Sequence, residues 1–195
     1  QTAPMVEIQW AHFPRDRPPN STVRKIVDTF IKNKKQIDSS KFGKSGTAAT
    51  GYTKFNSNAV LDILSKDLKE IPEMKIEEED SESGKINKIN IAILYGSEGR
   101  KEKTYEPDGW LESEGILLEI ECGLMIPQNK AHLKDLFKAC LIHGVNHFVI
   151  AGAINWEGST GTKYKPYNTM KVDFEAMYES TRFELPFETL TVIGF

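Results

Sequence analysis

The sequence predicts an α/β domain in which helices flank a mixed central β-sheet. Apolar residues recur with helical spacing in four segments, and short apolar runs typical of strands lie between them. A strand, a helix and a strand follow one another between residues 116 and 153, as a parallel crossover unit requires. A length of 195 residues suits one domain with a sizeable core better than two small ones, so 1–195 is expected to be a single domain.

Composition favours a soluble protein. Hydrophobic residues make up 39% and charged residues 27% of the chain, and no apolar stretch approaches the ~18 residues that span a bilayer. No secretory leader is recognisable, and Cys122 and Cys140 lie in apolar stretches rather than in a disulfide framework, which predicts a cytoplasmic protein without a membrane partner. The formal charge of −3 argues against wholesale coating of nucleic acid but leaves room for a local basic face.

Two helices are expected in the first part of the chain. The first covers about 22–35, because apolar residues recur at i, i+3, i+4, i+7 and i+8 from Val23. Residues 38–56 are small and polar without periodicity, which predicts a long mobile loop. A second helix is expected to begin at a cap on Asn58 and to end before Pro72.

The middle of the chain has the pattern of β-structure. The acidic run 77–84 repels itself and predicts a solvated turn between strands. Residues 89–95 and about 103–110 are expected to form a hairpin, because the segment 96–99 supplies turn residues. An apolar strand is predicted at 116–122.

The last part of the chain predicts a helix over 129–143, a buried strand at 148–153, a helix over 172–183 and a final strand at 190–195. The first of these helices is amphipathic, with separate apolar and basic stripes. The apolar stripe consists of Leu133, Leu136, Phe137, Cys140 and Leu141. The basic stripe consists of Lys130, Lys134 and Lys138.

Two acids interrupt the strand at 116–122. Glu119 and Glu121 are two residues apart, so they share one face of that strand. Carboxylates flanked by apolar residues are costly to desolvate and repel each other, so this pair needs a compensating cation or a wet cleft. Asp108 ends the preceding extended segment, and antiparallel pairing would bring its carboxylate alongside Glu119. Three hard oxygen donors favour Mg²⁺ or Mn²⁺ over zinc, which prefers nitrogen and sulfur.

Pro107-Asp108, ten further residues and Glu119-Ile120-Glu121 resemble the signature of the PD-(D/E)xK, or restriction endonuclease-like, nucleases. The final lysine of that signature is replaced by Glu121, as in its BamHI-like members. The resemblance to a BamHI-related bacterial group extends over about 57–195. It rests on Ser57-Asn58-Ala59-Val60-Leu61, Glu119-Ile120-Glu121-Cys122-Gly123, the segment Leu133 to Cys140, Leu185-Pro186 and Ile193-Gly194-Phe195.

The resemblance implies a metal-dependent endonuclease that hydrolyses double-stranded DNA, with a restriction or defence role. It implies that Asp108, the Glu119 carboxylate and the Ile120 carbonyl bind the metal ion. Residue 121 then orients or deprotonates the attacking water, and Glu121 serves either as that base or as another ligand. Asp62, on the second helix, is the candidate for an additional acid in the metal shell.

Other interpretations of the acids remain open. Glu119 and Glu121 also fit an exposed strand face paired with lysines, and Asp108 before Gly109 also fits ordinary turn chemistry. A pair of carboxylates is compatible with glycoside hydrolysis too, although neighbours on one strand seldom flank a sugar. A binding module that kept a nuclease fold without turnover is the rival function.

Nucleic-acid contacts are expected from lysines. Lys134 is the preferred phosphate contact on the helix over 129–143, with Lys130 and Lys138 beside it, although such a stripe is often only a solvated face. Lys44 belongs to a local basic excess in residues 24–54 that either contacts phosphates or is simply solvated. A homodimer is expected if the substrate is a palindromic duplex, because two-fold DNA is matched by two-fold protein.

Overall fold

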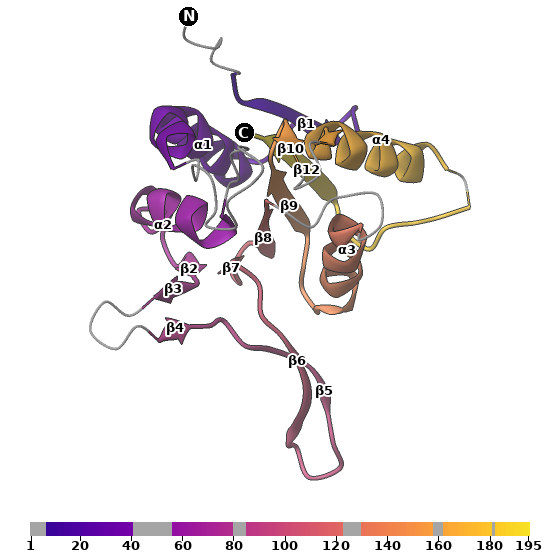
Figure 1. The fold of residues 1–195 in the computed structure, drawn as a ribbon. Coiled ribbons are helices and arrows are strands. Elements are labelled where there is room, and N and C mark those ends of the chain that lie inside the picture. Colours follow the sequence, from indigo (N-terminus) through magenta and orange to yellow (C-terminus); the bar gives the residue numbers. More distant parts are fainter. Residues whose placement is uncertain (1–6, 41–55, 80–84, 123–129, 158–161, 181) are drawn as a thin grey trace, which may run out of the picture.

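A six-stranded mixed sheet forms the centre of the computed structural model, which describes residues 7–40, 56–79, 85–122, 130–157, 162–180 and 182–195 (Figure 1). In spatial order its strands are β1 (Gln9–Phe13), β12 (Thr189–Gly194), β9 (His147–Gly152), β8 (Ile116–Glu121), β7 (Gly109–Leu111) and β2 (Lys75–Ile76). Strands β8, β9 and β12 are mutually parallel, whereas β1, β7 and β2 pair antiparallel with their neighbours. The predicted crossover from β8 to β9 is thereby confirmed.

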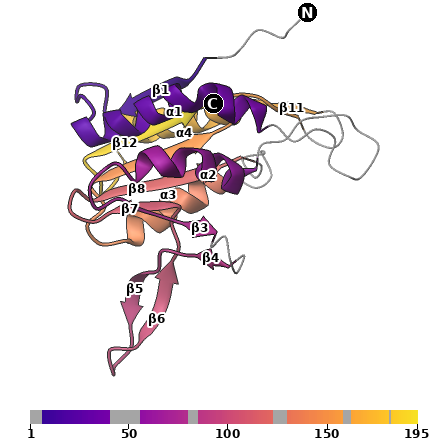
Figure 2. The same ribbon diagram turned by 90° about the vertical axis from the view of Figure 1, so that its left-hand side faces the viewer.

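Two pairs of helices cover the two faces of this sheet. Helices α1 (Ser21–Ser39) and α2 (Ser57–Leu68) lie on one face, and α3 (Ala131–Leu141) and α4 (Pro166–Glu179) lie on the other (Figure 2). Side chains of β8 alternate between the two cores: Ile116, Leu118 and Ile120 pack with α1 and α2, while Leu117 packs on the side of α3 and α4. The predicted α/β class with a helix-flanked mixed sheet is confirmed.

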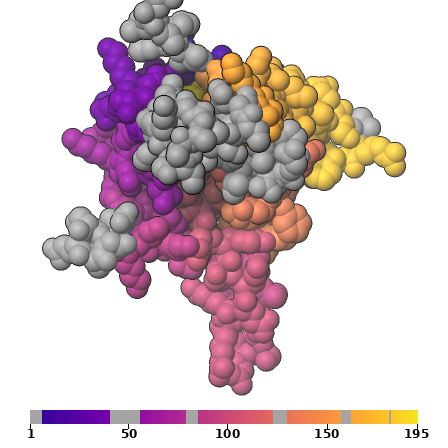
Figure 3. Space-filling view, viewed as in Figure 1, coloured from indigo at the N-terminus to yellow at the C-terminus, as the bar shows by residue number. Residues whose placement is uncertain are grey.

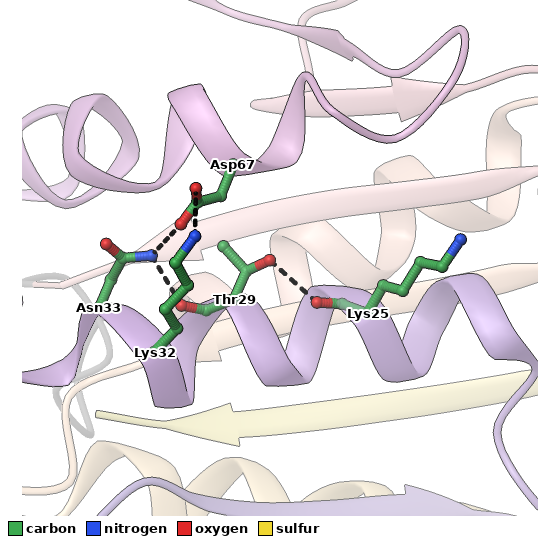
Figure 4. Close-up of polar contacts among 5 residues, drawn as sticks. All are labelled: Lys25, Thr29, Lys32, Asn33 and Asp67. Atoms are coloured by element: carbon green, nitrogen blue, oxygen red, sulfur yellow. Dashed lines mark hydrogen bonds and ion pairs between the residues drawn. The ribbon is translucent and has the colours of Figure 1, made fainter.

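One carboxylate joins α2 to α1. Asp67 accepts hydrogen bonds from Lys32 Nζ at 2.8 Å and from Asn33 Nδ2 at 2.7 Å (Figure 4). The Asn33 amide also donates to the Thr29 carbonyl at 3.0 Å, and the Thr29 hydroxyl donates to the Lys25 carbonyl at 2.9 Å. Helix α2 is therefore fixed to α1 by a buried amide as well as by its apolar face.

Three two-stranded ribbons stand outside the central sheet. They are β3 (Glu78–Glu79) with β4 (Ile86–Asn87), β5 (Ile91–Tyr95) with β6 (Lys101–Tyr105), and β10 (Trp156–Glu157) with β11 (Lys163–Tyr164). The β5–β6 hairpin, residues 91–105, projects away from the helices and the sheet (Figures 1 and 2). This hairpin is called the arm below.

Several helices begin or end at residues other than those predicted. Helix α1 extends to Ser39, and α2 begins after a cap on Asn56, whose side chain accepts from the N–H of Asn58 at 2.9 Å. The expected helix over 172–183 instead begins at Pro166 and ends at Glu179. Proline suits the first turn of a helix because no N–H is needed there, so Pro166 marked this start.

The expected extended segment 103–110 is divided. Residues 101–105 belong to the arm, whereas Gly109–Leu111 leave it and pair with β8. Pro107 separates the two, since it lacks an N–H for a ladder hydrogen bond. The predicted hairpin is confirmed, and Asp108 lies at the point where the chain changes partner.

The predicted apolar stripe of α3 is confirmed for Leu133, Leu136 and Cys140, which face the core, and is wrong for its other two residues. Phe137 and Leu141 are 61% and 40% exposed. The fully buried face consists of Ala131, His132, Asp135, Leu136 and Ala139. The buried His132 ring is accommodated by a 2.8 Å contact between its Nε2 and Asp173 Oδ2 of α4.

Some expectations fall on residues that the structure does not describe. Most of the predicted loop at 38–56 is such a segment, namely 41–55, and so is the part 80–84 of the acidic run. Glu78 and Glu79 of that run form β3 instead of a turn. Within the described ranges, no helix has the length and apolar character needed to cross a membrane.

Candidate functional site

The candidate site lies where β7 begins beside β8. Gly109 pairs with Leu118 in the antiparallel register, and one further step along this register places Asp108 opposite Glu119. Asp108 directly precedes β7 and Glu119 lies on β8, so the two acids are neighbours in space although ten residues separate them in sequence. Antiparallel pairing thus brings these two predicted residues together, as their order along the chain suggested.

The Asp108 carboxylate is fixed by the backbone of β8. Its Oδ2 atom accepts a hydrogen bond from the Ile120 N–H at 2.6 Å, and its own carbonyl accepts from the Glu77 N–H at 2.9 Å. Burial raises the pKa of Asp108 to about 7, although the Ile120 N–H favours the charged form. The negative charges of Glu77 and Asp135 raise this pKa further.

Glu119 is a buried carboxylate, 6% exposed, on the face that α3 covers. Burial raises its pKa well above the ordinary range, and the charges of Asp108 and Asp135 add to that effect. Lys138 and Lys134 act in the opposite direction. The Lys138 ammonium lies 3.8 Å from Glu119 Oε1, a distance that permits charge attraction without a hydrogen bond.

Asp135 is a third acid near this pair, and the sequence interpretation missed it. Its side chain lies 2.8 Å from Lys138 Nζ within α3 and is almost fully buried. Burial alone would lower the pKa of Lys138, yet Glu119, Asp135 and Asp108 together raise it, so the lysine is held charged. The orientation of α3 hid Asp135: with Phe137 and Leu141 placed inward, Asp135 points to solvent.

The other two predicted acids, Glu121 and Asp62, lie on β8 and α2. Glu121 is half-buried at the end of β8, and its charge acts on Cys122, whose pKa burial raises to about 12. Asp62 is exposed on α2 and lines a small hollow with Glu77 and Glu78. Ser57, at the start of α2, accepts a hydrogen bond from the Cys122 N–H at 3.1 Å, which joins this helix to the end of β8.

The lysines expected to contact phosphate differ in exposure. Lys134 is exposed on α3, and Lys130 is exposed at its N-cap in a left-handed conformation with φ 41°. Lys138 is half-buried among the acids, with 20% of its side chain exposed. Lys44 lies outside the described residues.

The donor chemistry at Asp108 and Glu119 fits a hard divalent cation, because both side chains offer carboxylate oxygens whose charges repel without one. Among the residues with described positions, no three Asp, Glu, His or Cys side chains are gathered closely enough to hold a metal ion by themselves. The arrangement therefore offers two side-chain ligands, and Asp62 is not gathered with them.

Comparisons with known proteins bear on the fold. No family model and no curated protein sequence matches the chain. Among solved structures, the restriction endonuclease BglII in complex with a DNA 16-mer is similar to it, with a TM-score of 0.56 and 13% identity. The match covers 97% of this chain and 76% of that one. The chain therefore has a restriction endonuclease-like fold, while the BamHI-like subtype stays a prediction.

Proposed function

We propose that this chain is a Mg²⁺- or Mn²⁺-dependent endonuclease that hydrolyses phosphodiester bonds of double-stranded DNA. One observation carries the proposal: two carboxylates, the partly buried Asp108 and the buried Glu119, oppose each other between inner strands of a restriction endonuclease-like sheet. A solved structure with this fold contains DNA, and a restriction or defence role is the corresponding biological setting.

The residues that would hold the cation are Asp108, Glu119 and the carbonyl of Ile120. The N–H and C=O groups of a strand residue point toward the same neighbouring strand, so the Ile120 carbonyl faces the side on which Asp108 accepts its N–H. Magnesium in nucleic-acid enzymes takes one or two carboxylates and completes its shell with water and substrate oxygens, so two side-chain ligands suffice. When bound, the cation lowers the pKa of water and stabilises charge on phosphate.

The remaining residues have roles that follow from their positions. Glu121 shares a face of β8 with Glu119 and is proposed to orient or deprotonate the attacking water. Lys134 is exposed next to the acids and is proposed to contact a substrate phosphate, with Lys130 and Lys44 as further contacts. Lys138 is proposed to balance the charges of Asp135 and Glu119 before substrate binds.

The experiment that tests this function combines calorimetric Mg²⁺ and Mn²⁺ titration with a plasmid-nicking assay. We expect the parent protein to bind metal and to cut plasmid only when metal is present. Glu184→Gln is the matched control, because Glu184 is an exposed acid outside the site, and it should behave as the parent does. A parent that neither binds metal nor cuts DNA would leave the non-catalytic binding module as the function.

Two further expectations belong to this proposal. A homodimer is expected if the duplex is palindromic, and light scattering with and without DNA measures it. A cytoplasmic location agrees with action on DNA and with Cys122 and Cys140, both of which are free thiols.

A further inference from the structure

The arm is separated from the rest of the fold by its pairing. Strands β5 and β6 pair with each other, and neither belongs to the central sheet. The turn at their tip is closed by a hydrogen bond from Gly96 N–H to the Arg100 carbonyl at 2.9 Å, and Gly99 has φ +72°. Figure 3 shows the arm as a protrusion with open space on both visible sides. Ile91, Ile93 and Tyr105 pack against the core on the side of α3 and α4, whereas Leu94 and Tyr95 are exposed.

The outer part of the arm combines two lysines with exposed apolar side chains. Lys101 and Lys103 lie on β6 at a point where the ladder with β5 shifts register. Their cross-strand partners include Tyr95, opposite Lys101, and Leu94, opposite Lys103. Tyr95 is 58% and Leu94 is 53% exposed, which is high for such large apolar side chains. The arm therefore offers both cations and apolar surface to a partner.

The acids of the arm do not cancel these lysines. The Glu102 carboxylate lies close to Gly96. Glu98 pairs with Arg100 at 3.0 Å. Within the described part of the chain, Lys101 and Lys103 form no ion pair, and Lys103 lies 5.5 Å from the centre of the Tyr105 ring. Two uncompensated cations on the arm fit a polyanion better than a second copy of the same basic hairpin.

The base of the arm is close to the candidate site. Only Glu106 and Pro107 separate the end of β6 from Asp108, a span of at most about 11 Å. A duplex with a phosphate at Asp108 would therefore pass the base of the arm. The five-residue strands reach about 17 Å, and the major groove of B-DNA, about 12 Å wide, admits a two-stranded ribbon.

We propose that the arm enters the major groove of the duplex whose backbone lies at Asp108 and Glu119, with Lys101 and Lys103 on its phosphates. This inference rests on the proposed function, because it takes duplex DNA as the substrate of that site. Leu94 and Tyr95 then supply apolar contact to base edges, for which thymine methyl groups are the matching partner.

The test measures duplex affinity by fluorescence anisotropy at several salt concentrations, without divalent metal so that no cleavage occurs. The variant is Lys101→Gln with Lys103→Gln, and the control is Lys66→Gln with Lys165→Gln, which removes the same charge from exposed positions on α2 and beside α4. Losing two phosphate contacts should reduce the slope of log K against log salt by about 1.8 and weaken binding at least tenfold. The control should change both by much less.

A second variant keeps the lysines and replaces Leu94 and Tyr95 by Ser, which should weaken binding of a specific duplex more than that of random DNA. Equal losses in the arm variant and the control would overturn the proposal. A changed oligomeric state with unchanged DNA affinity would overturn it too, and would assign the arm to protein contact. A parent that binds duplex through the arm but does not cut it would refute the nuclease proposal alone. A parent that binds no duplex refutes the arm proposal, whatever its metal affinity.

Discussion

Asp108 Oδ2 accepts the backbone N–H of Ile120 at 2.6 Å across the junction of β7 and β8. The side chain thereby takes the place of a ladder hydrogen bond, since β7 begins only at Gly109. A proposed metal ligand is in this way fixed to the strand that carries the other ligand, Glu119, before any cation is present. Such fixed geometry reduces the conformational entropy lost when a ligand binds.

Asp108→Asn should raise the stability of the metal-free protein at neutral pH while abolishing Mg²⁺ binding and cleavage. A folded pKa of about 7, above the unfolded value, means that ionisation opposes folding. The loss of folding stability caused by this ionisation is absent below about pH 4 and grows between about pH 4 and 7. Above that range it is complete and reaches at most about 4 kcal/mol. We expect a gain of about 1–3 kcal/mol, because Asn can still accept the Ile120 N–H. Denaturant unfolding of the parent and the variant from pH 4 to 8, with a chelator present, measures this difference in the free energy of unfolding. A variant that is less stable than the parent at pH 8 would contradict the prediction.

Mg²⁺ binding should become tighter as the pH rises through about 7. Burial holds a proton on Asp108 up to that region, and metal binding must displace it. Calorimetry in buffers of different ionisation enthalpy should show proton release at pH 6.5 and little at pH 8.5. Release that is identical at both pH values would exclude Asp108 as a ligand.

A comparison of Glu119→Gln with Glu121→Gln should show which of the two acids binds the metal ion and which acts on the attacking water. Glu119→Gln removes a charge from the proposed pair, so metal affinity and cleavage should fall together, by at least tenfold. Glu121→Gln should suppress turnover about 10²-fold with a smaller loss of Mg²⁺ affinity if Glu121 acts on water. Equal losses of Mg²⁺ affinity in the two variants would show that Glu121 is also a ligand.

Lys138→Met should destabilise the protein by about 2–3 kcal/mol, because it leaves the buried Asp135 carboxylate without its 2.8 Å partner. Adding Asp135→Asn should recover most of that loss, and Lys138→Arg should be tolerated better than Met. The control Lys134→Gln removes an exposed charge and should leave stability unchanged while weakening DNA binding. A Lys138→Met melt that matches the parent's would contradict the buried ion pair.

Asp67→Ala should destabilise the packing of α2 on α1 by about 1 kcal/mol, because Asn33 loses one of its two acceptors. Hydrogen bonds from Lys32 and then Asn33 lower the pKa of Asp67. The stability that depends on its charge is therefore present above about pH 4 and is lost as the pH falls through the folded pKa. Thermal melts at pH 3 and pH 7 should show a smaller difference between parent and variant at pH 3. Asp28→Asn, in an exposed pair with Arg24, is the control.

The sequence predicted the elements that periodicity and pairing rules specify. The apolar run of β8, the following helix and β9 are confirmed, because a buried parallel unit leaves a strong pattern. The pairing of Asp108 with Glu119 was also predictable, because two strands joined by a short connection usually pair as antiparallel neighbours. The roles assigned to these acids stay predictions.

Other features depend on tertiary contacts that one segment does not encode. The rotation of α3 buries Asp135 and exposes Phe137, because ion pairing with Lys138 compensates for an acid within the core. Strand β1 has too few residues for a reliable pattern and is defined by its partner β12. Pro166, by contrast, is a helix-start signal in the sequence, although the periodic apolar residues that predicted this helix lie further along the chain.

Strand β12 comes last along the chain, yet it occupies an interior place in the sheet between β1 and β9. Leu190 and Val192 of this strand are completely buried, so the core on that face cannot close before they arrive. During synthesis β1 therefore remains an unpaired edge while residues 14–188 are added, and its ladder forms by a long loop closure. Folding should be slow at this step, and the exposed edge of β1 during the interval is where self-association would begin.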